Sequence, residues 1–378
     1  MITTFHLPTK LVFGAGSLNQ LGAEVKGMGR RAMVVTYESN LLPSGLLDKT
    51  VQQLKDNGVA PVIFDKIVPN PRTSTIDEGV RLVKQENVDI VIGLGGGSAM
   101  DSAKGMVLAH AGDKPIWDYV GTKIEVFGTV LPLIMVPTVA ATGSEANHFA
   151  SLTNWEKRQK ALVFTPYMYP RVSIIDPELT VSLPARTTAQ GGVDIFCHTV
   201  ESYITAQTPS SITDGIMETA MRNAVMALPQ VLAKPEEIKF RSDLLWASII
   251  ANSPFITLGG GTGPLTLHGM STPLSGYFDA AHGDALAAML PAWMRFTQPV
   301  KPERFHSLGK NVFGAEDGVD ATEKWLSEVG MRLRLRDIGV KVEIFDEVAA
   351  RIEQAGRTKG HPRLLDATAI KQIYRESY

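Results

Sequence analysis

Two long segments of this chain differ in periodicity, and the difference constrains the fold. Between residues 31 and 176, short apolar runs alternate with segments that have the spacing of amphipathic helices. Strands separated by helices of this length predict a parallel sheet with helices on both faces. We expect strands at residues 31–36, 60–64, 88–95, 131–138 and 171–176, and helices at 44–58, 74–87 and 97–112.

Strand signals stop after about residue 183, and the rest of the sequence is typical of consecutive helices. The change falls in residues 177–192, where two prolines and two glycines interrupt regular structure. A chain of 378 residues is also too long for one small core. We therefore predict an α/β domain over residues 1–183 and an all-helical domain over residues 184–378. In the second domain we expect helices at 186–207, 210–233, 237–256, 262–278 and 281–297, with several more after them.

Two segments of the first domain fit the alternation less well. Residues 149–169 are irregular and we expect a hairpin there. The run GAGSLNQLG at residues 14–22 begins like a dinucleotide motif, but its third glycine comes six residues after Gly16. It also precedes the first parallel strand instead of following it. We interpret Gly14 and Gly16 as a turn that ends an N-terminal hairpin.

Composition excludes several classes of protein. Apolar residues make up 44% and charged residues 20% of the chain, which is typical of a soluble globular protein. A net charge of −2 does not suit a nucleic-acid partner, and no uninterrupted apolar stretch of about 18 residues could span a membrane. The single cysteine, Cys197, allows no internal disulfide, and no signal peptide is evident, so we expect a cytoplasmic protein.

Four residues of the second domain have the types and spacing of a metal site. Asp194 and His198 lie four residues apart in GGVDIFCHTVESYIT, which places them on one face of a helix. His268 and His282 begin and nearly end the run HGMSTPLSGYFDAAHG. Three imidazoles and one carboxylate suit zinc or ferrous iron. Any one of these histidines alone would more simply be a helix residue without a ligand.

A glycine-rich loop in the first domain suits a phosphate group. In IGLGGGSAMDSAK, Gly95, Gly96, Gly97 and Ser98 follow a predicted strand and begin a predicted helix. Glycines let the backbone approach a pyrophosphate, and the helix N-terminus offers unpaired N–H donors. The spacing is not that of the GxGxxG motif, and a glycine-rich turn without a ligand is the simpler alternative.

Polar residues follow three other predicted strands at the same edge of the sheet, where ligands of open α/β sheets bind. Glu38 follows the first strand, where its carboxylate would accept hydrogen bonds from an adenosine ribose and repel a 2′-phosphate. We therefore favour NAD(H) over NADP(H), although Glu38 could equally point into solvent. The other polar residues are Asn70, Thr138, Thr142, Ser144 and Asn147, although such residues are often plain turn residues.

Four motifs in order, GGGSAMDSAK, PTVAATGSE, GGVDIFCHTVESYI and HGMSTPLSGYFDAAHG, resemble the iron-containing (group III) alcohol dehydrogenase family, in particular its butanol dehydrogenase and aldehyde reductase branch. The resemblance covers nearly the whole chain. It implies a dinucleotide-binding α/β domain, a helical metal-binding domain, and a nucleotide cofactor in the cleft between them. It also implies one divalent metal ion, most simply Fe²⁺ with Zn²⁺ as the alternative, held by Asp194, His198, His268 and His282.

The resemblance further implies cofactor contacts. The loop of Gly96, Gly97 and Ser98 would hold the pyrophosphate. Other positions that match cofactor-contacting residues of the family are Asn70, Asp101, Thr138, Thr142, Asn147 and Lys160. Without the resemblance, Lys160 would be interpreted as a solvated surface lysine.

The chain departs from the family at one position. Members often have a histidine four residues after the third metal ligand, where this chain has Thr272. That histidine is thought to assist proton transfer, and here the Thr272 hydroxyl or a water molecule could pass the proton instead. His148, in the loop EANHF, could contact the substrate, although a loop histidine packed at the domain interface is at least as simple an interpretation. Thr272 and His148 are therefore weak catalytic candidates. No catalytic residue beyond the metal site is otherwise assigned.

The expected activity is hydride transfer between NAD(P)(H) and a small alcohol or aldehyde, with the metal polarising the substrate oxygen. Alternatives on the same scaffold are a dehydroquinate synthase-like lyase or a polyol dehydrogenase. Residues 194–205 and 266–288 contain no Lys or Arg to bind an anionic substrate, which argues against the lyase and against a polyol phosphate. A non-catalytic homologue would be expected to lose metal ligands. We expect a homodimer with no nucleic-acid or membrane partner.

Overall fold

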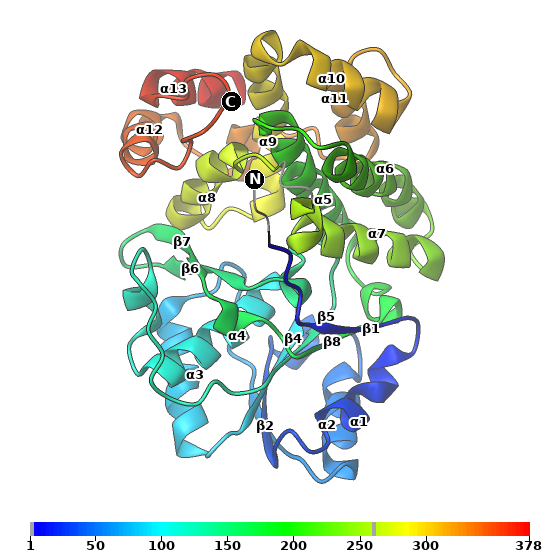
Figure 1. Ribbon diagram of the computed structural model, residues 1–378, viewed down its shortest axis with the longest axis vertical. Coiled ribbons are helices and arrows are strands. Elements are labelled where there is room, and N and C mark those ends of the chain that lie inside the picture. The colour runs from blue at the N-terminus through cyan, green and yellow to red at the C-terminus, as the bar shows by residue number, and fades with distance from the viewer. Residues whose placement is uncertain (1–3, 259–261) are drawn as a thin grey trace. The chain divides into compact units, whose positions relative to one another are not determined.

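The computed structural model describes residues 4–258 and 262–378 and consists of two compact units (Figure 1). One unit is Leu7–Leu183. The other is Pro184–Tyr378 together with the beginning of the chain as far as His6. The first unit contains the strands and the second is helical, as the periodicities predict.

The unit of residues 7–183 is built on a six-stranded sheet in the order β1-β8-β5-β4-β2-β3. All its pairings are parallel. Its strands are β1 (Lys10–Phe13), β2 (Arg31–Val35), β3 (Ala60–Phe64), β4 (Ile90–Gly95), β5 (Leu133–Pro137) and β8 (Val172–Ile175). The helices that accompany it are α1 (Leu21–Val25), α2 (Leu46–Asp56), α3 (Thr73–Gln85) and α4 (Gly97–Gly112).

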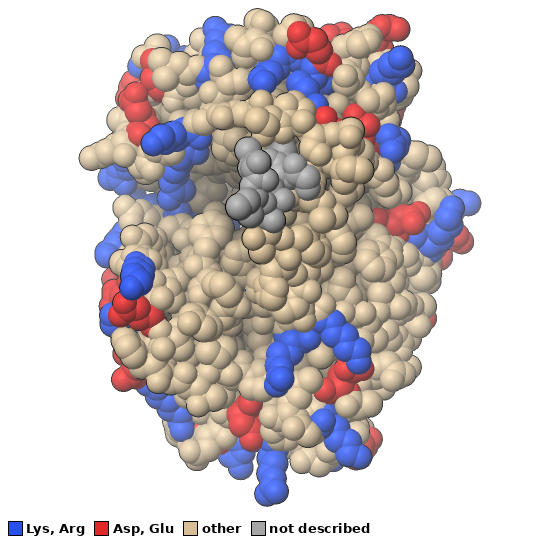
Figure 2. Space-filling view, in the orientation of Figure 1, with Lys and Arg blue, Asp and Glu red and all other residues tan. Residues whose placement is uncertain are grey.

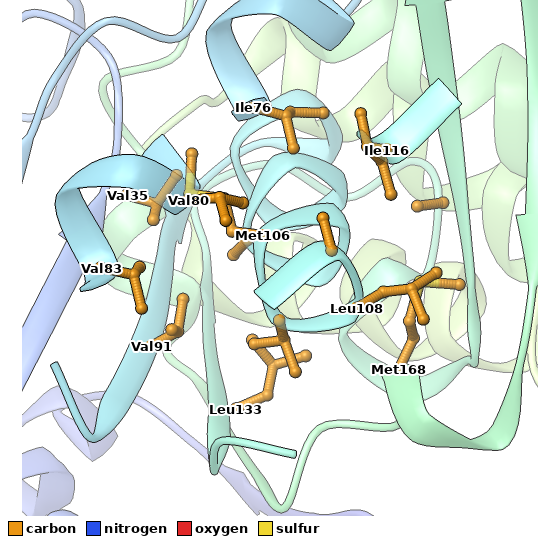
Figure 3. Packing of buried hydrophobic residues seen from close by; sticks show 14 of the residues in the cluster. Val35, Ile76, Val80, Val83, Val91, Met106, Leu108, Ile116, Leu133 and Met168 are labelled. Carbon is orange, nitrogen blue, oxygen red and sulfur yellow. The ribbon is translucent and has the colours of Figure 1, made fainter. Parts of the chain in front are cut away.

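Both faces of this sheet are buried because successive strand residues point to opposite sides. In β2, Met33 and Val35 join a core with α3 and α4, and Figure 3 shows side chains of this core around α4. Ala32 and Val34 join a second core on the other face, with α1 and α2. The near-continuous apolar strands of the sequence are therefore explained by helices on both faces.

A separate two-stranded antiparallel sheet follows β5 along the chain. It consists of β6 (Phe149–Asn154) and β7 (Gln159–Phe164). The hairpin expected within residues 149–169 is confirmed.

The N-terminal hairpin expected before Gly14 is wrong. Strand β1 pairs in parallel with β8, and the Asp176 carboxylate after β8 accepts hydrogen bonds from the backbone N–H groups of Gly16 (3.1 Å) and Leu18 (3.0 Å). The glycines do form a turn, with φ of +139° at Gly14 and +77° at Gly16. Local sequence shows the turn, but it cannot show that β1 pairs with β8, a pairing in which Lys10 lies opposite Val172.

The second unit is a helical assembly in which α5 is almost entirely buried from Thr188 to Thr205. Helix α5 packs against α6, α7 and α9. A helix with apolar and small residues all round is typical of such a central position. The helices are α5 (Ala185–Thr205), α6 (Ser211–Ala233), α7 (Ile238–Ala251), α8 (Thr266–Phe278), α9 (His282–Thr297), α10 (Pro302–Leu308), α11 (Gly318–Glu328), α12 (Phe345–Gln354) and α13 (Ala367–Glu376).

The surface agrees with the composition. On the face drawn in Figure 2, the described basic side chains are interspersed with acidic ones and do not gather into a broad basic patch. No helix within the described residues is both long enough and apolar enough to cross a bilayer.

Candidate functional site

Helices α5, α8 and α9 bring the predicted metal ligands of the helical unit together around one carboxylate. Asp194 lies in the middle of α5, His268 in the first turn of α8, and His282 is the first residue of α9. The potential ligand atoms of these three residues lie within 4.8 Å of one another. His198, one turn after Asp194 on α5, is outside that three-residue group but adjoins it.

One oxygen atom, Oδ1 of Asp194, is the common neighbour of all three imidazoles. It lies 3.2 Å from Nδ1 of His198, 3.4 Å from Nε2 of His268 and 3.7 Å from Nε2 of His282. The ring centroids of His198 and His268 are 4.1 Å apart, and those of His268 and His282 are 5.1 Å apart. The four residues thus converge from three helices.

The environment keeps Asp194 ionised. Burial alone would raise the pKa of its carboxyl group, but the adjacent His198, together with His268 and His282, lowers that pKa well below its ordinary value. Burial would likewise lower the pKa of His268, but the Glu201 and Asp194 carboxylates raise it to about 9. A cluster of this kind binds protons tightly when no other cation is present, and a divalent ion would compete with those protons.

These residues fit a divalent metal ion. Asp194 Oδ1 and His268 Nε2 are buried and have no hydrogen-bond partner within residues 4–258 and 262–378. Buried polar atoms are normally hydrogen-bonded, so these two atoms call for a further partner. One ionised oxygen with three imidazoles is a donor set that zinc and ferrous iron both accept.

Two residues beside this cluster were missed by the sequence interpretation. Glu201 lies seven residues after Asp194 on the same face of α5, and its Oε1 is 2.5 Å from Nδ1 of His268. Its helical spacing was a usable signal. Asn252, just after α7, places its Nδ2 3.0 Å from Nε2 of His198. No spacing in the sequence connects Asn252 with His198.

The two weak catalytic candidates make other contacts. The Thr272 hydroxyl donates a hydrogen bond of 2.7 Å to the carbonyl of His268, one turn earlier in α8. His148 lies in the α/β unit with its ring centroid 4.8 Å from that of Tyr169. A catalytic role for either residue stays a prediction.

In the α/β unit, the glycine loop joins the end of β4 to the start of α4, as expected. Gly95 has φ of +144°, and Gly97 is the first residue of α4. A Cβ at Gly97 would lie 2.8 Å from Cγ2 of Thr142, and one at Gly95 would lie 2.7 Å from Cε2 of Tyr37. Gly95 and Gly97 are therefore required because the side chains of Tyr37 and Thr142 leave no space for a Cβ atom. The same absence of side chains suits the binding of a phosphate group.

Buried side chains of the predicted cofactor set hold the loop of residues 138–147 against α4. The Asp101 carboxylate accepts hydrogen bonds from the Ser144 hydroxyl (2.7 Å) and the backbone N–H of Ser151 (2.8 Å). Asn147 donates to the carbonyl of Gly143 (2.9 Å). Asp101 and Asn147 thus position the loops, whatever contact they make with a cofactor.

Four further predicted cofactor positions lie on strands or in the loops that follow them. Lys160, on β7, is buried and donates a hydrogen bond of 2.8 Å to Asn70 Oδ1, so it is not the solvated surface lysine of the simpler interpretation. Asn70 has φ of +54°. Thr138 is buried directly after β5, where its backbone N–H donates to the carbonyl of Gly95. Glu38 is exposed just after β2. Contact of these residues with a cofactor stays a prediction.

Two buried charged residues of this unit were not predicted. The Lys104 ammonium group donates to Asn147 Oδ1 (2.7 Å) and to the carbonyl of Phe149 (2.9 Å). Burial lowers its pKa to about 8. The Glu145 side chain is also buried, and neither of its carboxylate oxygens has a hydrogen-bond partner in the described part of the chain. Burial raises the pKa of this carboxyl group to about 7. Their positions in a helix and a turn gave no sign of this burial.

Comparison with protein families matches both units. Residues 8–177 match the family model for iron-containing alcohol dehydrogenase, and residues 188–378 match the model for the C-terminal region of Fe-containing alcohol dehydrogenases.

Individual relatives match along their whole length. The chain is 31% identical to NADH-dependent butanol dehydrogenase A of Clostridium acetobutylicum, with 99% of each chain covered. It is 30% identical to 1,3-propanediol dehydrogenase of Klebsiella pneumoniae, covering 99% of this chain and 98% of the relative. The solved structure of NADH-dependent butanol dehydrogenase A from Thermotoga maritima superposes with a TM-score of 0.93 at 32% identity, covering 99% of this chain and 98% of that one.

The buried Glu145 carboxyl group predicts that wild type and Glu145→Gln differ in their free energy of unfolding, and that the difference depends on pH. Because folding raises its pKa from 4.5 to about 7, the folded state holds this proton more tightly, and the free energy of unfolding falls as pH rises through that window. Glu145→Gln resembles the protonated form and does not titrate. We expect equal stability of the two proteins below about pH 4.5, and a variant more stable by at most about 3 kcal/mol above about pH 7.

Chemical denaturation of both proteins from pH 4.5 to pH 8 measures this difference. A variant that is less stable than wild type at pH 8 would show that Glu145 is ionised and favourably paired.

Proposed function

The chain belongs to the iron-containing alcohol dehydrogenase family, and on that premise we propose that it transfers a hydride between NAD(H) and a small alcohol or aldehyde at a metal centre on α5, α8 and α9. The observation that supports the proposal most directly is the convergence of three imidazoles on the buried Asp194 carboxylate. As a family member it is an oxidoreductase that acts on CH–OH groups.

We propose that the substrate is small and uncharged. Relatives of similar identity are named for butanol, methanol and 1,3-propanediol. Residues 194–205 and 266–288, which contain the proposed ligands, include no Lys or Arg. An anionic substrate would need such a counter-charge near the reacting carbon, so a short aldehyde or alcohol fits this chain better than a sugar acid.

The proposed metal ligands are Asp194, His198, His268 and His282, and the family description favours ferrous iron over zinc. When bound, the ion supplies Lewis acidity toward the substrate oxygen. When bound, the nicotinamide cofactor supplies or accepts the hydride.

The protein's own part in the reaction is to hold these groups in place. Asp194 stays ionised in a buried position and so provides a fixed negative charge for a cation. The surrounding imidazoles lie on three different helices, whose packing fixes their directions. No strong general base is assigned to the chain.

For the nucleotide, we propose that the backbone of Gly95, Gly96, Gly97 and Ser98 holds the pyrophosphate at the start of α4. The first N–H groups of that helix have no partner within the helix and suit an anion. The bonds that Asp101 and Asn147 make to the loop of residues 138–147 hold the second wall of this site.

The exposed Glu38 carboxylate supports NAD(H) as the preferred cofactor, in agreement with the names of relatives described as NADH-dependent. A 2′-phosphate beside it would meet a like charge. This preference, like the rest of the site, is a proposal that rests on the residue's position after β2.

The glycine loop predicts that Gly97→Ala weakens cofactor binding. Since the new methyl group would also contact the Thr142 side chain at 2.8 Å, the informative comparison is the double variant Gly97→Ala/Thr142→Ala against Thr142→Ala alone. We expect the double variant to bind NADH at least about tenfold more weakly, by calorimetric titration, because the backbone can no longer approach the pyrophosphate. Equal affinities would place the phosphates elsewhere.

The metal site predicts that His282→Ala loses both metal and turnover. We expect metal affinity to fall by more than the roughly 10–100-fold typical of residues that only support a ligand. Elemental analysis and NADH oxidation at 340 nm, with butyraldehyde and added Fe²⁺ or Zn²⁺, measure the two effects. His306→Ala, an exposed histidine on α10, is the matched control. Full metal content and normal rate in His282→Ala would exclude this site.

If Glu38 determines the preference for NAD(H), Glu38→Gly should use NADPH better relative to NADH. Two unit charges about 4 Å apart in water repel by about 1 kcal/mol, which corresponds to a roughly fivefold change. We expect the ratio of kcat/KM for NADPH to that for NADH to rise at least about fivefold in the variant. Wild-type preference for NADPH, or an unchanged ratio, would show that Glu38 does not contact the ribose.

A further inference from the structure

The carboxylate of Glu201 joins α5 to the first turn of α8. Its Oε2 accepts hydrogen bonds from the backbone N–H groups of Leu267 (2.6 Å) and His268 (3.1 Å). These groups are among the first N–H donors of α8, which have no acceptor within that helix. The residue before the helix, Leu265, has no side chain that could cap it. A side chain from another helix therefore caps α8.

The second oxygen of the same carboxylate contacts a proposed metal ligand. Glu201 Oε1 lies 2.5 Å from Nδ1 of His268. On the opposite side of the ring, Nε2 of His268 faces Asp194 Oδ1 at 3.4 Å. The Glu201 side chain is fully buried, so no solvent competes for these contacts.

This arrangement determines which nitrogen of His268 carries a hydrogen. An ionised carboxylate only accepts hydrogen bonds, so Nδ1 must be the donor. In the neutral imidazole the lone pair is then on Nε2, the atom directed at Asp194. The same carboxylate also fixes the backbone at residue 268, so both the tautomer and the direction of the ring depend on it.

We propose that Glu201 is a positioning residue of the metal centre: it holds the hydrogen on Nδ1 of His268 and orients Nε2 toward the ion. This inference rests on the proposed function and adds a residue to it. In carboxylate–histidine–metal arrangements of this kind, replacing the carboxylate typically lowers metal affinity about 10–100-fold.

Glu201→Gln separates this role from that of a helix cap. The amide has nearly the same shape, and its oxygen can still accept from the two backbone N–H groups. Its NH₂ group then faces Nδ1 of His268 and favours the hydrogen on Nε2, where the ion should bind. The flipped amide would instead place its NH₂ against two N–H donors. That donor–donor contact disfavours the flipped orientation, so the variant adopts the orientation that keeps the helix cap and weakens metal binding.

The test is the affinity for Zn²⁺ of the full-length protein after removal of metal, measured at 20 °C by competition with a chromophoric chelator. We expect Glu201→Gln to bind about 10–100-fold more weakly than wild type. Glu218→Gln is the matched control, because Glu218, on α6, accepts a hydrogen bond from Tyr203 of α5. Within the described residues, its hydrogen bonds involve Tyr203 and Asn311 and no histidine. This control variant should bind like wild type.

The effect of Zn²⁺ on Tm distinguishes a purely structural role. A cap alone would lower Tm equally with and without the ion. Weaker binding reduces the rise in Tm that the ion produces, since that rise depends on the ratio of free ion to Kd. Should Glu201→Gln not fold, Glu201→Asp decides the question. This variant keeps the negative charge, but its side chain is shorter by one C–C bond, about 1.5 Å, so the carboxylate lies further from His268. We expect it to bind Zn²⁺ several-fold more weakly than wild type.

Wild-type affinity in Glu201→Gln, or in Glu201→Asp if only that variant folds, would overturn the role of Glu201 and leave the proposed function intact. A wild-type protein that binds no Zn²⁺ and no Fe²⁺ would overturn the proposed function itself, and this inference with it.

Discussion

A negative charge buried on α5 is the constraint on which the site of the helical unit depends. Removing a carboxylate from water costs several kcal/mol unless it is paired. Around Asp194 the chain places three imidazoles from three helices, and behind one of them a second buried carboxylate, Glu201. Each group is stable there only with the others or with a cation among them.

The α/β unit positions its proposed ligand by a different means. Its glycine loop offers backbone N–H groups, and buried polar side chains hold the neighbouring loop against it. Asp101 and Lys104, both on α4, bind the segment of residues 144–151 through hydrogen bonds of 2.7–2.9 Å. Buried hydrogen-bond networks in which every donor and acceptor has a partner make the structure around them rigid. The phosphate-binding geometry is thus proposed to exist before the nucleotide arrives.

The sequence predicted the features that depend on local periodicity and on residue type. The alternation of strands and helices follows from the pattern of apolar residues, and the glycine loop between β4 and α4 follows from its residue types. The pairing of Asp194 with His198 follows from a spacing of one helical turn. The partner of β1 and the contact of Asn252 with His198 join residues far apart in the sequence, which periodicity does not report. The burial of Lys104 and Glu145 was likewise hidden, because charged residues are expected at the surface unless tertiary contacts show otherwise.

The most direct test of the metal centre is an anomalous difference map from a crystal of the protein loaded with Fe²⁺ or Zn²⁺, with data collected on both sides of the metal's absorption edge. The convergence on Asp194 predicts one strong peak about 2.0–2.2 Å from a carboxylate oxygen of Asp194 and from the imidazole nitrogens of His198, His268 and His282. A map with no peak among these four residues, or with its only peak at a different group of side chains, would contradict it.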